Sequence, residues 1–204
     1  MRPKVAIIDY GMGNLYSVRN TFDSLGIRAD IIDKPHRLMS YGKLILPGVG
    51  AFGDAMKELN RRGFIGPVEE FVAIGKPFLG ICLGMQLLLE KSEESRGVKG
   101  LSIVPGEVKK FSLKLKCPHI GWNKIKKLFP RLNIFKGLKG DIYTYFCHSY
   151  FARPKDRSVV IGETQYGIKF ASIIKQGNVY GMQFHPEKSQ ETGLNLLRNF
   201  IERC

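Results

Sequence analysis

Short apolar runs separated by a helical pattern mark the first half of the chain. Val5–Ile8, Ala29–Ile32 and Lys43–Leu46 are each predicted to form a buried strand. The spacing of apolar residues after the first run predicts a helix from about Ser17 to Leu25. Gly26 follows this helix, where a residue with positive φ commonly ends a helix. Strands that alternate with helices are typical of an α/β protein with a parallel sheet wrapped by helices.

The second half of the chain predicts a succession of shorter strands. They span Gly106–Phe111, Trp122–Ile125, Asp141–Cys147, Val159–Thr164, Phe170–Lys175 and Val179–Phe184. A final helix from about Glu191 to Ile201 carries leucines at helical spacing, so it should pack on the sheet. No segment resembles a linker, and we therefore expect one domain over residues 1–204.

Basic residues outnumber acidic ones, with 32 Lys and Arg against 18 Asp and Glu and a formal net charge of +14. Residues 109–140, the basic stretch, contain no acidic residue and many basic ones, at positions 109, 110, 114, 116, 124, 126, 127, 131, 136 and 139. Phe111, Leu113 and Leu115 alternate with polar residues there, which predicts a strand with one solvated face. Docking to an acidic partner is the second interpretation. Nucleic-acid binding is disfavoured, because no stacking array of aromatic residues accompanies the lysines.

The composition also disfavours membrane and disulfide-rich classes. No apolar run approaches the length of a membrane span and Val5–Ile8 is too short for a signal-peptide core, so we expect a soluble cytoplasmic protein. The cysteines form no C-x-x-C pair, which argues against a zinc site and against a disulfide framework. Cys117, Cys147 and Cys204 are expected to be small buried hydrophobes. His119 has no chemical partner nearby in the sequence and is expected to be structural or exposed.

Cys82 stands in a different setting, at the centre of Gly-Ile-Cys-Leu-Gly, between an apolar run and a helical pattern. This spacing is typical of a sharp turn from strand to helix, because a Cβ at Gly80 or Gly84 would clash with the tight backbone. A side chain at the first turn of a helix lies near the positive end of the helix dipole, which favours a thiolate. Cys82 is therefore a candidate nucleophile.

A base and a group to orient it follow far downstream, in the motif His-Pro-Glu at residues 185–187. His185 comes at the end of a predicted strand, and Glu187 can accept its second ring proton and fix the tautomer. Backbone amides at Leu83 and in Val49-Gly50 are expected to stabilise an oxyanion. Because these segments follow strands, we expect the active site at the carboxyl edge of the sheet.

These motifs resemble those of the class I (triad-type) glutamine amidotransferases and, more narrowly, of the glutaminase subunits of imidazole glycerol phosphate synthase in histidine biosynthesis. The match runs nearly end to end, through residues 9–15, 46–52, 80–88, 118–123, 148–150 and 183–190. The cysteine elbow and His-Pro-Glu are shared by the superfamily, whereas Pro-His-x-Gly-Trp-Asn and His-Pro-Glu-Lys-Ser-Gln indicate that subunit. The resemblance implies a single-domain, three-layer, flavodoxin-like fold with a mixed, largely parallel central sheet.

The resemblance also implies the chemistry of the site. Cys82, His185 and Glu187 would form a triad that hydrolyses glutamine to glutamate and ammonia, with no cofactor and no metal. Further residues implied to meet the substrate are Gly50, Gln86, Ser149 and Tyr150.

A partner subunit is implied in the same way. Ammonia would become ammonium in water, so it would pass along a sealed path to the synthase (cyclase) subunit of a heterodimer. Trp122, Tyr145 and Lys188 would lie at the subunit contact. The Val49-Gly50 peptide is expected to rearrange before the oxyanion hole is complete, so the chain alone should be nearly inactive. Cys147 stands where the family commonly has an aliphatic residue, and we expect no chemistry from it.

The residues alone leave three other functions open. A glutaminase subunit of another amidotransferase, such as pyridoxal phosphate synthase, would share the triad, but residues 118–123 argue against it. A DJ-1-like cysteine protein would leave His-Pro-Glu unexplained. A nucleic-acid-binding protein would use the basic stretch, and its affinity would fall steeply with salt.

Overall fold

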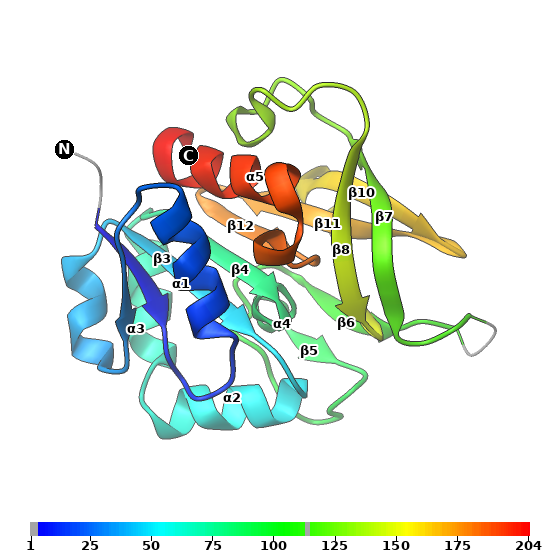
Figure 1. Ribbon diagram of the computed structural model, residues 1–204. Helices are drawn as coiled ribbons and strands as arrows, with labels where there is room; N and C mark the ends of the chain where they lie inside the picture. The colour runs from blue at the N-terminus through cyan, green and yellow to red at the C-terminus, as the bar shows by residue number, and fades with distance from the viewer. Residues whose placement is uncertain (1–3, 113–114) are drawn as a thin grey trace.

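The computed structural model describes residues 4–112 and 115–204 (Figure 1). Its central strands are β1 (Val5–Ile8), β2 (Ala29–Ile32), β3 (Lys43–Gly48), β4 (Phe78–Cys82), β7 (His119–Lys127), β8 (Ile142–His148), β10 (Val160–Tyr166), β11 (Ile168–Gln176) and β12 (Val179–Met182). In the described residues they form one nine-stranded sheet in the order β2-β1-β3-β4-β12-β11-β10-β7-β8. A smaller sheet is formed by β5 (Lys91–Ser92), β6 (Gly106–Lys110) and β9 (Tyr150–Pro154).

The central sheet changes from parallel to antiparallel pairing at β12. From β2 to β12 neighbouring strands run parallel, and from β12 to β8 they run antiparallel. β4 and β12 are neighbours although they are far apart in the sequence, with Gly80 opposite Gly181 and Ile81 opposite Met182. The carboxyl ends of these two strands therefore meet at one edge of the sheet.

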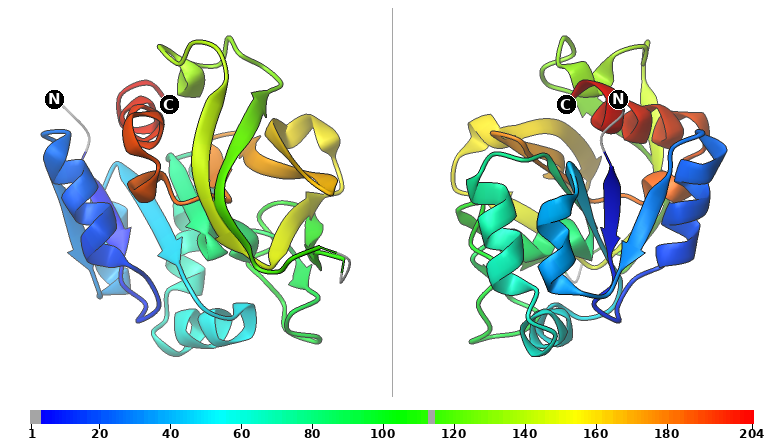
Figure 2. Two further views of the ribbon diagram at one scale, coloured as in Figure 1. Left: turned by 45° about the vertical axis from the view of Figure 1, so that its right-hand side comes forward. Right: turned by 90° about the vertical axis from the view of Figure 1, so that its left-hand side faces the viewer.

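Helices cover both faces of the parallel half and give the fold three layers. α1 (Leu15–Ser24) and α5 (Gln190–Arg203) share one core with alternate β1 residues such as Ile7. α2 (Phe52–Arg61), α3 (Ile65–Ala73) and the short α4 (Leu83–Leu87) share the other core with Ala6 and Ile8. In the right-hand view of Figure 2 the blue α1 and red α5 lie on one side of β1 and the turquoise α3 on the other. Within residues 4–112 and 115–204, no helix is long and apolar enough to cross a bilayer.

The three-layer α/β architecture confirms the expected fold class, while several element boundaries differ from the predictions. α2 and α3 were not anticipated by the sequence analysis. The strand with one solvated face that was predicted through Phe111 and Leu115 is wrong for the residues that the structure describes, because β6 ends at Lys110. Residues 113 and 114 of that prediction lie outside the described residues. β12 ends at Met182 instead of Phe184, because the chain then turns toward β8. One domain over residues 1–204 stays a prediction.

The predicted burial of the other cysteines is also wrong. Cys117 and Cys147 are exposed and Cys204 is half-buried. Cys147 lies on β8 two residues after Tyr145, and strand alternation places both side chains on the outward face. The register of an edge strand thus decides whether a side chain on it is buried or exposed. The residue type alone does not determine that register.

Candidate active site

Cys82 lies where β4 passes into α4, with φ of 54° and ψ of −108°. A residue other than glycine rarely adopts positive φ, and such strain is common at functional turns. A Cβ at Gly80 would lie 2.5 Å from the carbonyl oxygen of Gly84, and a Cβ at Gly84 would overlap the carbonyl oxygen of Leu46. The sharp turn therefore requires glycine at both positions, as the sequence analysis expected.

His185 and Glu187 form a buried pair beside this turn. His185 Nδ1 lies 2.8 Å from Glu187 Oε1, and the two side chains are 9% and 2% exposed. The backbone N–H of His185 donates to the carbonyl oxygen of Tyr145 over 2.9 Å, which fixes this segment against β8. Because β12 is paired with β4, the residues that follow β12 reach Cys82. The structure thus brings together the three residues of the expected triad.

The environment of His185 favours its protonated form. Burial alone would lower the pKa of His185, but hydrogen bonds and charge interactions with Cys82 and Glu187 raise that pKa to about 10. At neutral pH the imidazole then carries both ring protons, with one of them held by Glu187. The arrangement is suited to nucleophilic attack by sulfur followed by proton donation from the ring.

A cavity of about 350 Å³ opens beside Cys82. Its lining contains most of the residues expected from the sequence, namely Val49, Gly50, Cys82, Leu83, Gln86, Ser149, Tyr150, His185 and Lys188. Glu187, Trp122 and Tyr145 are absent from the lining of this cavity, and Glu187 is linked to it through its hydrogen bond with His185. A nucleophile, a protonated base and several loop segments therefore face one cavity.

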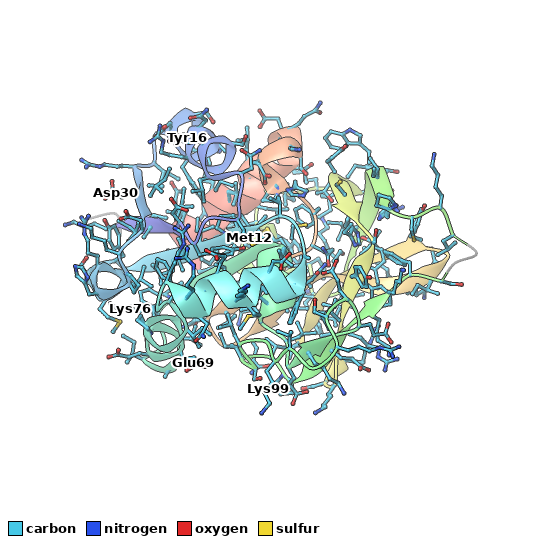
Figure 3. All side chains as sticks on the ribbon, turned by 90° about the horizontal axis from the view of Figure 1, so that it is seen from below. Met12, Tyr16, Asp30, Glu69, Lys76 and Lys99 are labelled. Atoms are coloured by element: carbon cyan, nitrogen blue, oxygen red, sulfur yellow. The ribbon has the colours of Figure 1, made fainter. Side chains whose placement is uncertain are left out.

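The expected oxyanion loop lies next to the sulfur. Gly48 stands opposite Cys82 in the β3–β4 register, so the chain after β3 delivers Val49 and Gly50 to the cavity. Gly50 has a φ of +93°, and a Cβ there would meet Met12 Cε at 2.9 Å. Met12 packs against the core cluster that contains the α2 side chains, and it is labelled in the view from below (Figure 3). The loop therefore depends on glycine at residue 50.

A family model described as Glutamine amidotransferase class-I matches residues 6–204. The chain belongs to this family. Two similar curated proteins are both named imidazole glycerol phosphate synthase subunit HisH. The one from Moorella thermoacetica is 49% identical over 203 residues, which cover 99% of this chain and 95% of that protein. The one from Aquifex aeolicus is 48% identical over 204 residues, which cover 98% of this chain and 97% of that protein.

Solved structures of amidotransferases share the fold. One glutamine amidotransferase has a TM-score of 0.77 at 22% identity, covering 97% of each chain. PurLQS from Thermotoga maritima has a TM-score of 0.77 at 18% identity, covering 98% of each chain. At these identities the likeness shows the three-layer amidotransferase fold alone.

Gln183 and Glu94 are among the residues of this amidotransferase site that the sequence analysis missed, as are the lining residues Pro118, Cys147 and His148. Gln183 Nε2 lies 3.9 Å from Cys82 Sγ, and its Oε1 accepts from Gln86 Nε2 over 3.2 Å. Glu94 lines the cavity, and its Oε2 accepts from the backbone N–H of Phe52 over 2.8 Å. Gln183 stands two residues before His185, and this closeness to the His-Pro-Glu segment is a usable signal. Glu94 stands in a polar loop with no motif around it, so nothing local marks it.

The three residues expected at the subunit contact form one cluster. The rings of Trp122 and Tyr145 lie edge to face, 6.2 Å apart between centroids, on the paired strands β7 and β8. Lys188 Nζ lies 5.8 Å from the centroid of the Tyr145 ring. Ile120 and Tyr143 extend the cluster along the same outward face and are exposed. This aromatic face borders the cavity through Lys188.

Proposed function

We propose that this chain is the glutaminase subunit of an imidazole glycerol phosphate synthase. The observation that carries the proposal is the nucleophile elbow at Cys82, which faces one cavity together with the hydrogen-bonded pair of His185 and Glu187. The name shared by the close relatives favours this subunit over that of a pyridoxal phosphate synthase. Free cysteines agree with a reducing compartment, and we place the reaction in the cytoplasm.

Glutamine fits the polar groups that line the cavity. Glu94 offers a carboxylate to the α-ammonium group, and its second oxygen stays available because Phe52 N–H occupies only one. Ser149 and Tyr150 line the same space, and we assign their backbone to the α-carboxylate. Gln86 is held by the Tyr150 carbonyl over 3.0 Å and bounds the cavity beside Cys82. The side-chain amide of glutamine then points to the sulfur.

The reaction follows from the protonation states at the site. Cys82 Sγ forms a bond to the amide carbon, and the resulting oxyanion is stabilised by the N–H groups of Gly50 and Leu83. His185 gives its proton to the nitrogen, the C–N bond breaks, and ammonia leaves a glutamyl thioester. Water then adds to the thioester carbon and returns a proton to His185. The C–S bond breaks and glutamate is released, with Glu187 keeping the ring oriented throughout.

Ammonia must be transferred without contact with water, because ammonium is not a nucleophile. The aromatic face of Trp122 and Tyr145, with Lys188 at the edge of the cavity, is the surface we assign to the synthase subunit. The basic stretch runs through β7 on this side of the molecule, which favours an acidic partner surface. The Val49-Gly50 peptide is assigned a role in partner control, since it completes the oxyanion hole only when it adopts the required orientation.

The test is glutamate release from glutamine, measured with and without the synthase subunit and its nucleotide-like ligand. The wild type should hydrolyse glutamine strongly only in the complex, and Cys82→Ala should abolish the reaction. Cys147→Ser is the matched control, because this cysteine also lines the cavity and should leave the rate within about threefold. Persistent hydrolysis by Cys82→Ala would refute the triad, and equal rates with and without the partner would refute partner control.

A further inference from the structure

A line of hydrogen bonds follows the inward face of β7 and β8, which are drawn side by side in Figure 1, and reaches the cavity at His148, which is part of the cavity lining. Asn123 Nδ2 lies 3.2 Å from His119 Nε2, and His119 Nδ1 lies 3.2 Å from His148 Nε2. His148 Nδ1 lies 2.7 Å from the carbonyl oxygen of Tyr150. We call Asn123, His119, His148 and the Tyr150 carbonyl the histidine relay.

The two ends of the relay determine which atom donates and which accepts in each of its hydrogen bonds. Asn123 donates from Nδ2 to the Gln165 carbonyl over 3.0 Å and accepts at Oδ1 from the Lys124 N–H over 2.7 Å, so its amide orientation is fixed. Its Nδ2 must also donate to His119. At the other end the Tyr150 carbonyl can only accept. His119 and His148 are therefore both neutral, each with its proton on Nδ1 and its lone pair on Nε2.

Burial keeps the two rings in this neutral form. Burial lowers the pKa of His148 to about 3, and burial also lowers the pKa of His119. The His119 ring stacks between Tyr166 and Phe146, with centroids 4.0 and 5.0 Å away. An apolar surrounding strengthens a satisfied hydrogen bond and raises the cost of an unsatisfied one. The loss of any donor in the relay would therefore leave an unsatisfied buried acceptor on the next residue.

The relay ends on a group that belongs to the cavity. The Tyr150 carbonyl accepts a second hydrogen bond, from Gln86 Nε2 over 3.0 Å, and Gln86 also reaches Gln183 over 3.2 Å. Tyr150 is the first residue of β9, where the chain leaves the central sheet for the smaller one. Without the donor from His148, the Tyr150 carbonyl keeps only the side-chain hydrogen bond from Gln86, and its position at the cavity wall is less restricted.

We propose that Asn123, His119 and His148 are positioning residues, which hold the Tyr150 carbonyl and Gln86 in the arrangement that binds glutamine. The proposal rests on the proposed function, because it names the substrate of that same site. Gln86 and Tyr150 meet parts of the substrate that do not react. Their displacement should therefore raise KM and leave kcat nearly unchanged.

Substitutions at His119 separate positioning from packing. His119→Asn keeps an N–H near the place of Nδ1, whereas His119→Gln places its amide near Nε2, and His119→Phe keeps the ring stack without any donor. In the complex with the synthase subunit, His119→Gln and His119→Phe should raise the KM for glutamine about tenfold or more, because His148 Nε2 is left unpaired. His119→Asn should stay within about threefold of the wild type. Melting curves identify any variant that fails to fold.

The opposite order overturns the inference: if His119→Phe binds glutamine like the wild type and His119→Asn does not, the ring matters only for packing. A second measurement does not depend on turnover. Nitrogen-15 NMR of the imidazoles in the full chain should find the Nδ1–H tautomer at both histidines, and an Nε2–H or cationic ring at either one overturns the relay. If the wild-type complex does not hydrolyse glutamine, the proposed function fails even where the tautomers agree.

Discussion

The substitution Gly80→Ala tests whether the turn at Cys82 sets the rate. A Cβ at Gly80 would lie 2.5 Å from the carbonyl oxygen of Gly84 and 2.7 Å from the backbone nitrogen of Met85. Ordinary contacts begin at 3.4 Å, so the start of α4 has to move away by the 0.9 Å that separates 3.4 from 2.5. A displacement of about 1 Å in a catalytic arrangement costs about 100-fold in rate. Overpacking of this kind costs about 1–3 kcal/mol of stability.

The assay is kcat/KM for glutamine hydrolysis in the complex, together with the free energy of unfolding in urea. Gly80→Ala should lose about 100-fold in kcat/KM, because the Leu83 N–H and Cys82 Sγ move with α4. Gly66→Ala is the control, since a Cβ there has no atom within 4 Å and the residue lies in α3. It should keep full activity and gain about 0.5–1 kcal/mol. Wild-type activity and stability in Gly80→Ala would refute the steric argument.

Three further predictions concern the same region. Glu187→Gln should lower kcat about 10³-fold at nearly constant KM, because an amide at this place no longer selects the His185 tautomer; a loss below tenfold in steady-state assays would contradict this. Ser189→Ala should cost about 1–3 kcal/mol in urea unfolding, since Ser189 Oγ accepts from the Tyr145 N–H over 2.9 Å, and an unchanged unfolding midpoint would rule this out. Burial lowers the pKa of His148 from 6.5 to about 3, so its neutral form contributes fully above pH 6.5 and the contribution disappears as the pH falls toward 3. Unfolding free energy should therefore drop by about 1.4 kcal/mol per pH unit in that window relative to His148→Asn, and equal slopes in both proteins would contradict it.

Local signals predicted the turn at Cys82 and the contact between His185 and Glu187, whereas the catalytic roles of these residues stay predictions. The spacing of Gly80, Cys82 and Gly84 is a backbone requirement, and each glycine prevents a specific clash. His185 and Glu187 are two residues apart and meet through one short turn, so their contact needs no long-range information. What the sequence alone left undetermined is that β4 and β12 are neighbours, because a parallel pairing depends on the whole order of the sheet.

The errors have equally physical causes. Phe52, Met56 and Leu59 show the helical spacing of α2, and the sequence analysis did not use it. α3 is hidden by Pro67, which signals a turn in isolation but is tolerated in the first turn of a helix. Cys147 was expected to be buried from its residue type, yet the register of β8 turns it outward. Residue type and pattern predict an element, whereas its register decides which of its side chains are buried and which are exposed.

The two halves of the central sheet contribute differently to the site, and this has a consequence for partner control. The parallel half supplies Cys82 and, through β12, the segment of His185. The antiparallel half supplies the aromatic face and the histidine relay. Tyr145 connects the aromatic face to the base, because its ring lies against Trp122 and its carbonyl accepts from the His185 N–H over 2.9 Å. Docking of the proposed partner on Tyr145 would therefore act on His185 through one hydrogen bond and on glutamine binding through the strand that carries His148. Docking should thus change kcat and KM by separate routes, and the His119 variants would alter only the second.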